Sequence, residues 1–326
     1  MVVIPEKNEF CIFCYDFDAN GTAANAKLNG LSDDSELTWW HLDALNPDTS
    51  GFLASDIGLP LLIVDALLAE DTRPRIQEFD NGLLVILRGV NTNENARPDD
   101  MISLRIWIED ERIITIRRRS LKTARDLAEK IEAGQFAATA SGDILSFIIG
   151  RLLFHTAPIV ADLEDKCDAL EEHVIEDPEK SLRKTIMNLR KTAITLRRYL
   201  SPQREVLSML RMEENSFFNA HHKKIFQEQA NSFTRLVEDL DMLRERSQII
   251  QDELTSTLAD QLNRNMYLLS VIAAIFLPLG FLTGLLGINV GGIPGAENDQ
   301  AFWYFCGGLS ILIILQITLF RKAKWF

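Results

Sequence analysis

YLLSVIAAIFLPLGFLTGLL, residues 267–286, is the stretch that decides how this chain is organised. It lies within residues 265–296, where 32 consecutive positions carry no Asp, Glu, Lys, Arg or His. About 20 apolar residues in a helix cross the roughly 30 Å hydrocarbon core of a membrane. We therefore predict a transmembrane helix over residues 266–288.

A second span is predicted over residues 301–320, where the sequence again carries no charge. It begins with the aromatic run FWYF at 302–305, which is typical of a membrane interface. The loop at 289–300 has no basic residue, whereas Arg264 precedes the first span and the tail at 321–326 is basic. The positive-inside rule then puts both termini in the cytoplasm. Two runs of this length beside an aromatic belt favour spanning over a hairpin buried in a soluble core.

Composition limits the function classes. The chain has 34 Lys and Arg against 47 Asp and Glu, a net charge of -13, which argues against nucleic acid as a partner and favours a cation. Five histidines and four cysteines are too scattered for a disulfide framework. We find no phosphate-binding loop, zinc-protease helix or catalytic triad, and predict that the chain is not an enzyme.

The remaining residues predict two cytoplasmic parts. Residues 1–142 read as an α/β domain, with expected strands at 10–15, 37–42, 82–87, 103–108 and 112–116 and helices at 60–68 and 121–133. Residues 143–265 read as a helical domain and stalk. Asp177-Pro178 predicts a helix start, Ser201-Pro202 repeats that signal, and the segment from Phe218 to Ile288 predicts one helix that runs into the first span, with a possible kink at Pro278.

One face of the first span is small or polar. It consists of Asn263, Met266, Ser270, Ala273, Leu277, Gly280 and Gly284, spaced three and four residues apart. This face could line a pore, or it could be a seam where helices pack closely. A two-span hairpin encloses no pathway alone, so conduction would require several copies around an axis. Without a charged residue in the span, an ion would have to pass largely hydrated.

The outer end of that span reads Gly287-Ile288-Asn289, followed by a glycine-rich loop. A ring of Asn289 amides could hydrogen-bond the water shell of an arriving cation, although an ordinary helix cap and loop explains the same residues. In the loop, Glu297 and Asp299 could concentrate cations or simply be solvated. Below the membrane, Asp252, Glu253 and Asp260 lie on the stalk, and the sequence does not fix which faces the axis.

Two groups could in principle be zinc ligands, His221-His222 and Cys11-x-x-Cys14. Adjacent histidines on a helix point about 100° apart, and residues i and i+3 of a strand face opposite sides. Neither group therefore forms a metal site alone, and a single CxxC is weak evidence for one.

Several motifs together resemble the CorA family of divalent-cation transporters. They are Gly-x-Asn at the end of the first span, WHLD at 40–43, the segment 68–90, LRRYLSPQREVL at 196–207, and FLPL at 276–279, and they cover nearly the whole chain. Ile288 replaces the Met usual at the middle of the tripeptide, and with VGGIPG at 290–295 this is similar to the zinc-transporting ZntB branch.

The resemblance implies a homopentameric funnel in the cell inner membrane, with Asn263, Met266, Leu277 and Asn289 along the pore and Asp252 as a possible metal-binding acid. It implies Zn²⁺ as the transported ion and proton-linked uptake as the mode of transport, with lipid and further copies as partners and no cofactor. The alternatives are a Mg²⁺, Co²⁺ or Ni²⁺ channel gated by cytoplasmic metal, and a membrane-anchored metal sensor that conducts nothing.

Overall fold

A seven-stranded sheet forms the centre of the first of two units into which the chain divides, Met1–Asp252 and Glu253–Phe326. The computed structural model describes residues 10–25, 36–214, 216–288, 295 and 298–322. The strands follow the order β2-β1-β3-β7-β6-β5-β4. Their bounds are β1 Cys11–Phe17, β2 Ala23–Asn25, β3 Leu37–Asp43, β4 Arg75–Phe79, β5 Gly82–Gly89, β6 Ile102–Ile108 and β7 Arg112–Arg117. β3 and β7 pair in parallel, and the other neighbours pair antiparallel.

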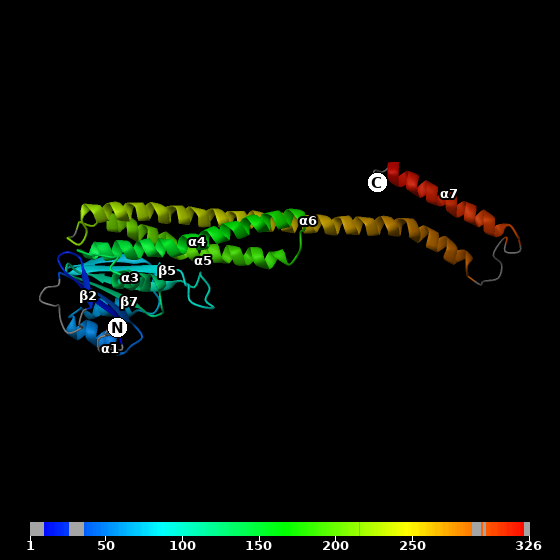
Figure 1. Cartoon of the computed structure of the whole chain (residues 1–326). Coiled ribbons are helices and arrows are strands. Elements are labelled where there is room, and N and C mark those ends of the chain that lie inside the picture. Colours follow the sequence, from blue (N-terminus) through cyan, green and yellow to red (C-terminus); the bar gives the residue numbers. More distant parts are fainter. Residues whose placement is uncertain (1–9, 26–35, 215, 289–294, 296–297, 323–326) are drawn as a thin grey trace. The chain divides into compact units, whose positions relative to one another are not determined.

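Both faces of this sheet are covered, because every residue of β5 and β6 is buried. On one face lie α1 (Asp48–Gly51), η1 (Phe52–Asp56), which is a short π-helix, and α2 (Leu61–Leu68). They share a hydrophobic core with the strands that includes Leu42, Leu84, Trp107, Ile114, Leu53, Ile63 and Leu67. The long helices α4 (Ser141–Glu176) and α5 (Leu182–Met212) contact β5 and run along the sheet, as Figure 1 shows. Strands covered on both sides read as continuous apolar runs, which is why they were predictable.

The remaining helices are α3 (Lys122–Glu132), α6 (Ala220–Leu286) and α7 (Ala301–Lys322). The single long helix predicted between Phe218 and Ile288 is confirmed as α6, which has 67 residues and contains Pro278. The α/β sheet, this long helix and the apolar C-terminal helices are the predicted fold class. The finer limits at 142, 265, 288, 300 and 320 remain predictions.

The start of α6 is joined to the start of α4 by a buried histidine. The side chain of His222 is 1% exposed, its Nδ1 accepts a hydrogen bond from the Asn219 N–H at 3.3 Å, and its Nε2 lies 2.9 Å from Asp143 Oδ1. Since Nδ1 accepts, Nε2 carries the proton and donates to Asp143. Burial raises the pKa of the Asp143 carboxyl, but hydrogen bonds from His222 and from the Thr139 and Ala140 backbone outweigh it and hold the pKa below its usual value. His222 is therefore a structural residue.

Two predicted helix limits are wrong. α5 begins at Leu182 rather than at Pro178, because residues 180 and 181 first form a turn, closed by the bond from Leu182 N to Glu179 O at 3.1 Å. α5 also continues through Pro202 to Met212. The buried Gln203 accepts a hydrogen bond from the Arg88 N–H of β5 at 2.7 Å, and Val206 and Leu207 are also buried. This packing offsets the roughly 3 kcal/mol that a proline costs inside a helix.

A β-bulge between Cys11 and Phe13 corrects the prediction that Cys11 and Cys14 face opposite sides of their strand. The extra residue shifts the register, and both thiols pack against the same hydrophobic core. A hydrogen bond with Cys11, together with burial, raises the pKa of the Cys14 thiol far above its usual range. A neutral thiol is a poor metal ligand, because the thiolate is the binding form.

His41 in β3 is completely buried and stacks on Phe13, with ring centroids 5.6 Å apart. Its Nδ1 lies 2.8 Å from the Thr115 hydroxyl, whereas its buried Nε2 has no hydrogen-bond partner among the described residues. Protonation would leave an N–H group without an acceptor. Burial, followed by the positive charge of Arg117, lowers the pKa of His41 from 6.5 to about 3.

Acid is therefore expected to destabilise the fold through His41. Between pH 6.5 and about 3 the unfolded chain binds one proton more than the folded chain. The contribution of neutral His41 to the free energy of unfolding is complete above pH 6.5. Below that pH it decreases by about 1.4 kcal/mol per pH unit. Melting temperatures measured from pH 7.5 to 5.0 should fall less steeply for His41→Leu than for the wild type. Equal slopes of melting temperature against pH for the two proteins would contradict the lowered pKa of His41.

Candidate functional site

The predicted stripe of seven residues lies on α6 and is exposed along its whole length in the single chain. Its larger members, Met266 and Leu277, are 66% and 72% exposed. At Gly280 and Gly284 an added Cβ would meet no atom within 4 Å. Nothing in the described part of the chain fills this face. We call the seven residues the α6 stripe.

A different face of α6 is covered instead. Its members are buried or half-buried and are Val271, Ala274, Ile275, Pro278, Leu279 and Leu282. On this face Gln316 of α7 forms a hydrogen bond with α6, in which its Nε2 lies 3.5 Å from the Ala274 carbonyl oxygen. The α6 stripe is thus not a packing seam between the two helices of one chain. Two roles remain for the α6 stripe, the lining of a pore and a packing seam between copies.

Hydroxyl groups in these helices bond back to their own backbone. Ser270 Oγ donates to the Met266 carbonyl at 2.8 Å, and Thr283 Oγ1 donates to the Leu279 carbonyl at 3.0 Å. Ser310 and Thr318 do the same in α7. A hydroxyl that donates to its own helix still offers oxygen lone pairs on its exposed side. Ser270 therefore presents an acceptor on the α6 stripe, which suits a hydrated cation.

α7 has no buried residue and exposes large apolar side chains such as Trp303, Ile311 and Ile314. So extensive an apolar surface needs a lipid or protein partner. By length and composition, α4, α6 and α7 could each cross a membrane. In α4, however, Ile144, Leu145, Ile148, Ile149 and Leu152 are buried within the first unit. The two predicted spans correspond to α6 and α7, and the number of spans remains a prediction.

The predicted outer mouth is described only in part. α6 ends at Leu286, and the Gly287 N–H bonds to the carbonyls of Thr283 at 2.9 Å and Gly284 at 3.2 Å. Ile288 and Asp299 are exposed, whereas Asn289 and Glu297 lie outside the described residues. Before α7, Asn298 Oδ1 accepts a hydrogen bond from the Gln300 N–H at 2.9 Å. The roles of Gly287, Ile288, Asn289, Glu297 and Asp299 remain predictions.

Asp252 is the acid on the stalk that was predicted as a metal ligand. Asp252 is exposed on α6 and accepts a hydrogen bond from Gln248 Nε2 at 2.8 Å. Over the part of the chain that the structure describes, no three His, Cys, Asp or Glu side chains form a metal-binding group. A metal at Asp252 would therefore need ligands from further copies.

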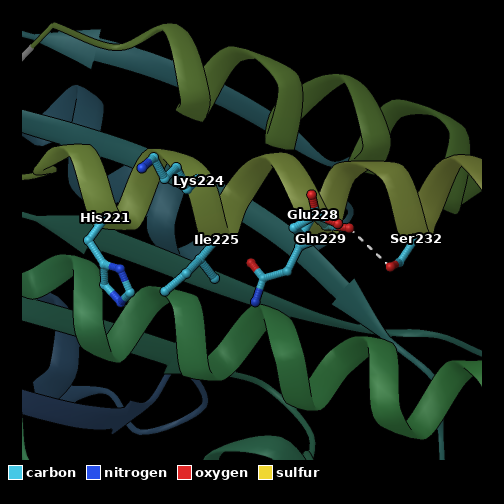
Figure 2. A pocket seen from close by; sticks show the side chains of 6 residues that line it. All are labelled: His221, Lys224, Ile225, Glu228, Gln229 and Ser232. Carbon is cyan, nitrogen blue, oxygen red and sulfur yellow. Dashed lines mark hydrogen bonds between the residues drawn. The ribbon is translucent and has the colours of Figure 1, made fainter.

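His221 lies at a surface hollow of about 410 Å³, whose other lining residues are Lys224, Ile225, Glu228, Gln229 and Ser232 (Figure 2). Gln229 reaches across to the Ser146 carbonyl of α4 at 2.7 Å. The hollow belongs to the first unit and contains none of the α6 stripe. It offers one imidazole and one carboxylate, which do not make a metal site.

Sequence reasoning missed Gln316. It is the only side chain of α7, among the described residues, with a hydrogen bond to α6. The signal was present as a lone amide within the apolar run 311–320, opposite a span that contains a proline. No sequence pattern predicts that the Gln316 amide contacts the backbone of α6 near Pro278.

Comparisons with known proteins agree on one family. The family model described as "CorA-like Mg2+ transporter protein" matches residues 34–322. The divalent cation transporter CmaX of Pseudomonas aeruginosa is 38% identical over 292 residues, 89% of this chain and 88% of that protein. The zinc transport protein ZntB of Yersinia enterocolitica is 34% identical over 314 residues, 96% of this chain and 95% of that protein. The solved structure of full-length CmaX superposes with a TM-score of 0.85 at 34% identity, over 99% of this chain and 100% of that one.

Proposed function

Because this chain belongs to the CorA family of divalent-cation transporters, we propose that it moves Zn²⁺ across a membrane through a pore lined by the α6 stripe of several copies. Members of this family are transporters, which confirms the prediction that the chain is not an enzyme. The exposed α6 stripe is the observation that carries the proposal, since the chain's own second span leaves it free.

Several copies are required because one hairpin cannot surround a pathway. The family resemblance supports five. In this arrangement the glycines of the α6 stripe leave room for water, and Ser270 contributes hydroxyl oxygens. The basic residues Arg321 and Lys322 in the last turn of α7 support cytoplasmic termini in the inner membrane. The predicted segments 1–265 would then be cytoplasmic, with spans at 266–288 and 301–320, an outer loop at 289–300 and a tail at 321–326.

Zinc is supported by two observations, the relatives named zinc transport protein and Ile288 in the Gly-x-Asn tripeptide. The described part of the α6 stripe offers no thiolate, imidazole or carboxylate. Selectivity would therefore act on the hydrated ion at the mouth rather than through soft ligands within the bilayer. The proposed mode is proton-linked uptake, in which the pH gradient assists ion entry.

Purified protein in liposomes tests the proposal directly. Flux of Zn²⁺, Mg²⁺, Ni²⁺ and Cd²⁺ would be followed with and without a pH gradient. We expect Zn²⁺ to enter fastest and the gradient to accelerate it severalfold. Faster entry of Mg²⁺ than of Zn²⁺ would favour the magnesium channel, and binding of metal without any flux would favour the sensor.

The same assay applies to the proposed mouth. Asn289→Ala is expected to lose at least tenfold in Zn²⁺ flux and to assemble normally by size-exclusion chromatography, because the amide ring that holds the ion's water shell is gone. Asn298→Ala is the matched control in the same loop. Within the described part of the loop it removes only the side-chain bond to the Gln300 N–H, and the variant should retain most of the flux. Unchanged flux in Asn289→Ala would exclude this residue from the mechanism.

A further inference from the structure

Pro278 removes one backbone hydrogen bond from the middle of α6. In an α-helix each N–H donates to the carbonyl four residues earlier. Proline has no N–H, so the Ala274 carbonyl loses its partner within the helix. A backbone carbonyl without a partner is costly inside a membrane, where no bulk water can replace the lost bond.

Gln316 of α7 supplies the missing donor. Its Nε2 lies 3.5 Å from the Ala274 carbonyl oxygen. A carbonyl can only accept, so the NH₂ end of the amide must face it, and this fixes the orientation of the side chain. Gln316 Oε1 is buried and has no hydrogen-bond partner in the described part of the chain. The amide is therefore placed for this one bond rather than for a polar network of α7.

The contact lies beside the proposed pathway. Both Ala273, which directly precedes the turn from Ala274 to Pro278, and Leu277, which lies within it, belong to the α6 stripe. A helix bends most readily at a proline, where the ladder of hydrogen bonds is interrupted. Whatever holds this turn also sets the direction of the rest of α6, including Gly284.

We propose that Gln316 of α7 is a positioning residue. It replaces the hydrogen bond that α6 loses at Pro278 and so fixes the direction of α6 around Leu277. The inference rests on the proposed membrane-spanning pore, but it depends neither on the identity of the ion nor on the number of copies. The inference couples two residues: the hydrogen bond from Gln316 is needed because position 278 is a proline.

A double-mutant cycle tests this pairing in the full-length assembly. The variants are Gln316→Leu, Pro278→Ala and both together, measured for Zn²⁺ flux in liposomes and for melting temperature in detergent. Pro278→Ala restores the N–H and lets the Ala274 carbonyl bond within α6. We expect Gln316→Leu to reduce flux at least fivefold and to lower the melting temperature when Pro278 is present. Both effects should largely disappear in the Pro278→Ala background.

Ser310→Ala is the matched control, because among the described residues the Ser310 hydroxyl bonds only within α7, to the Cys306 carbonyl at 2.9 Å. Its effect should be small and the same in both backgrounds. Equal effects of Gln316→Leu with and without Pro278 would overturn the proposal. The melting temperature reports the pairing even if the wild type conducts no divalent cation, so that failure of the transport proposal is distinguishable from failure of this one.

Discussion

Replacing Gly284 with leucine is expected to reduce divalent-cation flux at least tenfold while the chain still folds and assembles. An added Cβ at Gly284 meets no atom within 4 Å in the single chain, so the larger side chain causes no internal clash. Leucine is also a better helix former than glycine by roughly 0.8 kcal/mol. In the assembly, however, each copy would project four more carbon atoms into the shared pathway and exclude the hydrated ion.

Gly308→Leu is the control for this substitution. Gly308 lies on α7 and also has no atom within 4 Å of an added Cβ, but it is outside the α6 stripe. The same chemical change should leave more than half of the wild-type flux. Equal inhibition by both substitutions would indicate a general effect of bulk in the membrane, and full flux in Gly284→Leu would remove Gly284 from the pathway.

The second large effect is expected at Gly142, where α4 meets the start of α6. A Cβ on Gly142 would lie 2.3 Å from Nδ1 and 2.6 Å from Cγ of the His222 ring. The ring cannot move aside without losing its bonds to Asp143 and Asn219. Overpacking together with a broken buried hydrogen bond costs about 2–4 kcal/mol. We expect Gly142→Ala to lower the melting temperature of the purified protein by several degrees.

Gly150→Ala, on the same helix, is the comparison for Gly142→Ala. Its Cβ would lie 3.4 Å from Gln229 Nε2, an ordinary contact, and alanine favours helix by roughly 1 kcal/mol over glycine. Gly150→Ala should therefore be neutral or stabilising. Adding His222→Ala to Gly142→Ala should cost less than the sum of the two single changes, because the clash is removed. Equal melting temperatures for Gly142→Ala and Gly150→Ala would contradict the packing described here.

The sequence predicts the long-range organisation of this fold well. The absence of glycine and proline between Phe218 and Pro278, with apolar residues at helical spacing, predicts α6 correctly. β5, β6 and β7 are predictable because strands buried on both faces are rich in apolar residues, although the buried Arg88 and Arg105 interrupt the runs in β5 and β6. The sequence does not predict β4 as a strand of its own, because among the described strands it pairs only with β5 at the sheet edge and most of it is exposed.

Local exceptions depend on tertiary contacts that no sequence pattern contains. Pro202 stays within α5 because Gln203 bonds to β5, and a bulge at Cys11 turns two thiols to one side. The α6 stripe could be predicted from spacing alone, but spacing could not predict that α7 contacts a different face of α6. The contact between Gln316 and Ala274 joins residues 42 positions apart, and it appears only when both helices are placed.

Access of water-soluble reagents to the α6 stripe shows whether this face borders an aqueous pathway. In a chain whose four native cysteines are replaced by serine, single cysteines would be placed at Ala273, on the stripe, and at Ile272, about 100° away around the helix. A water-soluble thiol reagent that does not cross lipid would then be added during Zn²⁺ flux. We predict that the reagent modifies Ala273→Cys and blocks its flux, whereas Ile272→Cys is not modified and keeps its flux. Modification of Ile272→Cys alone, or of neither variant, would contradict it.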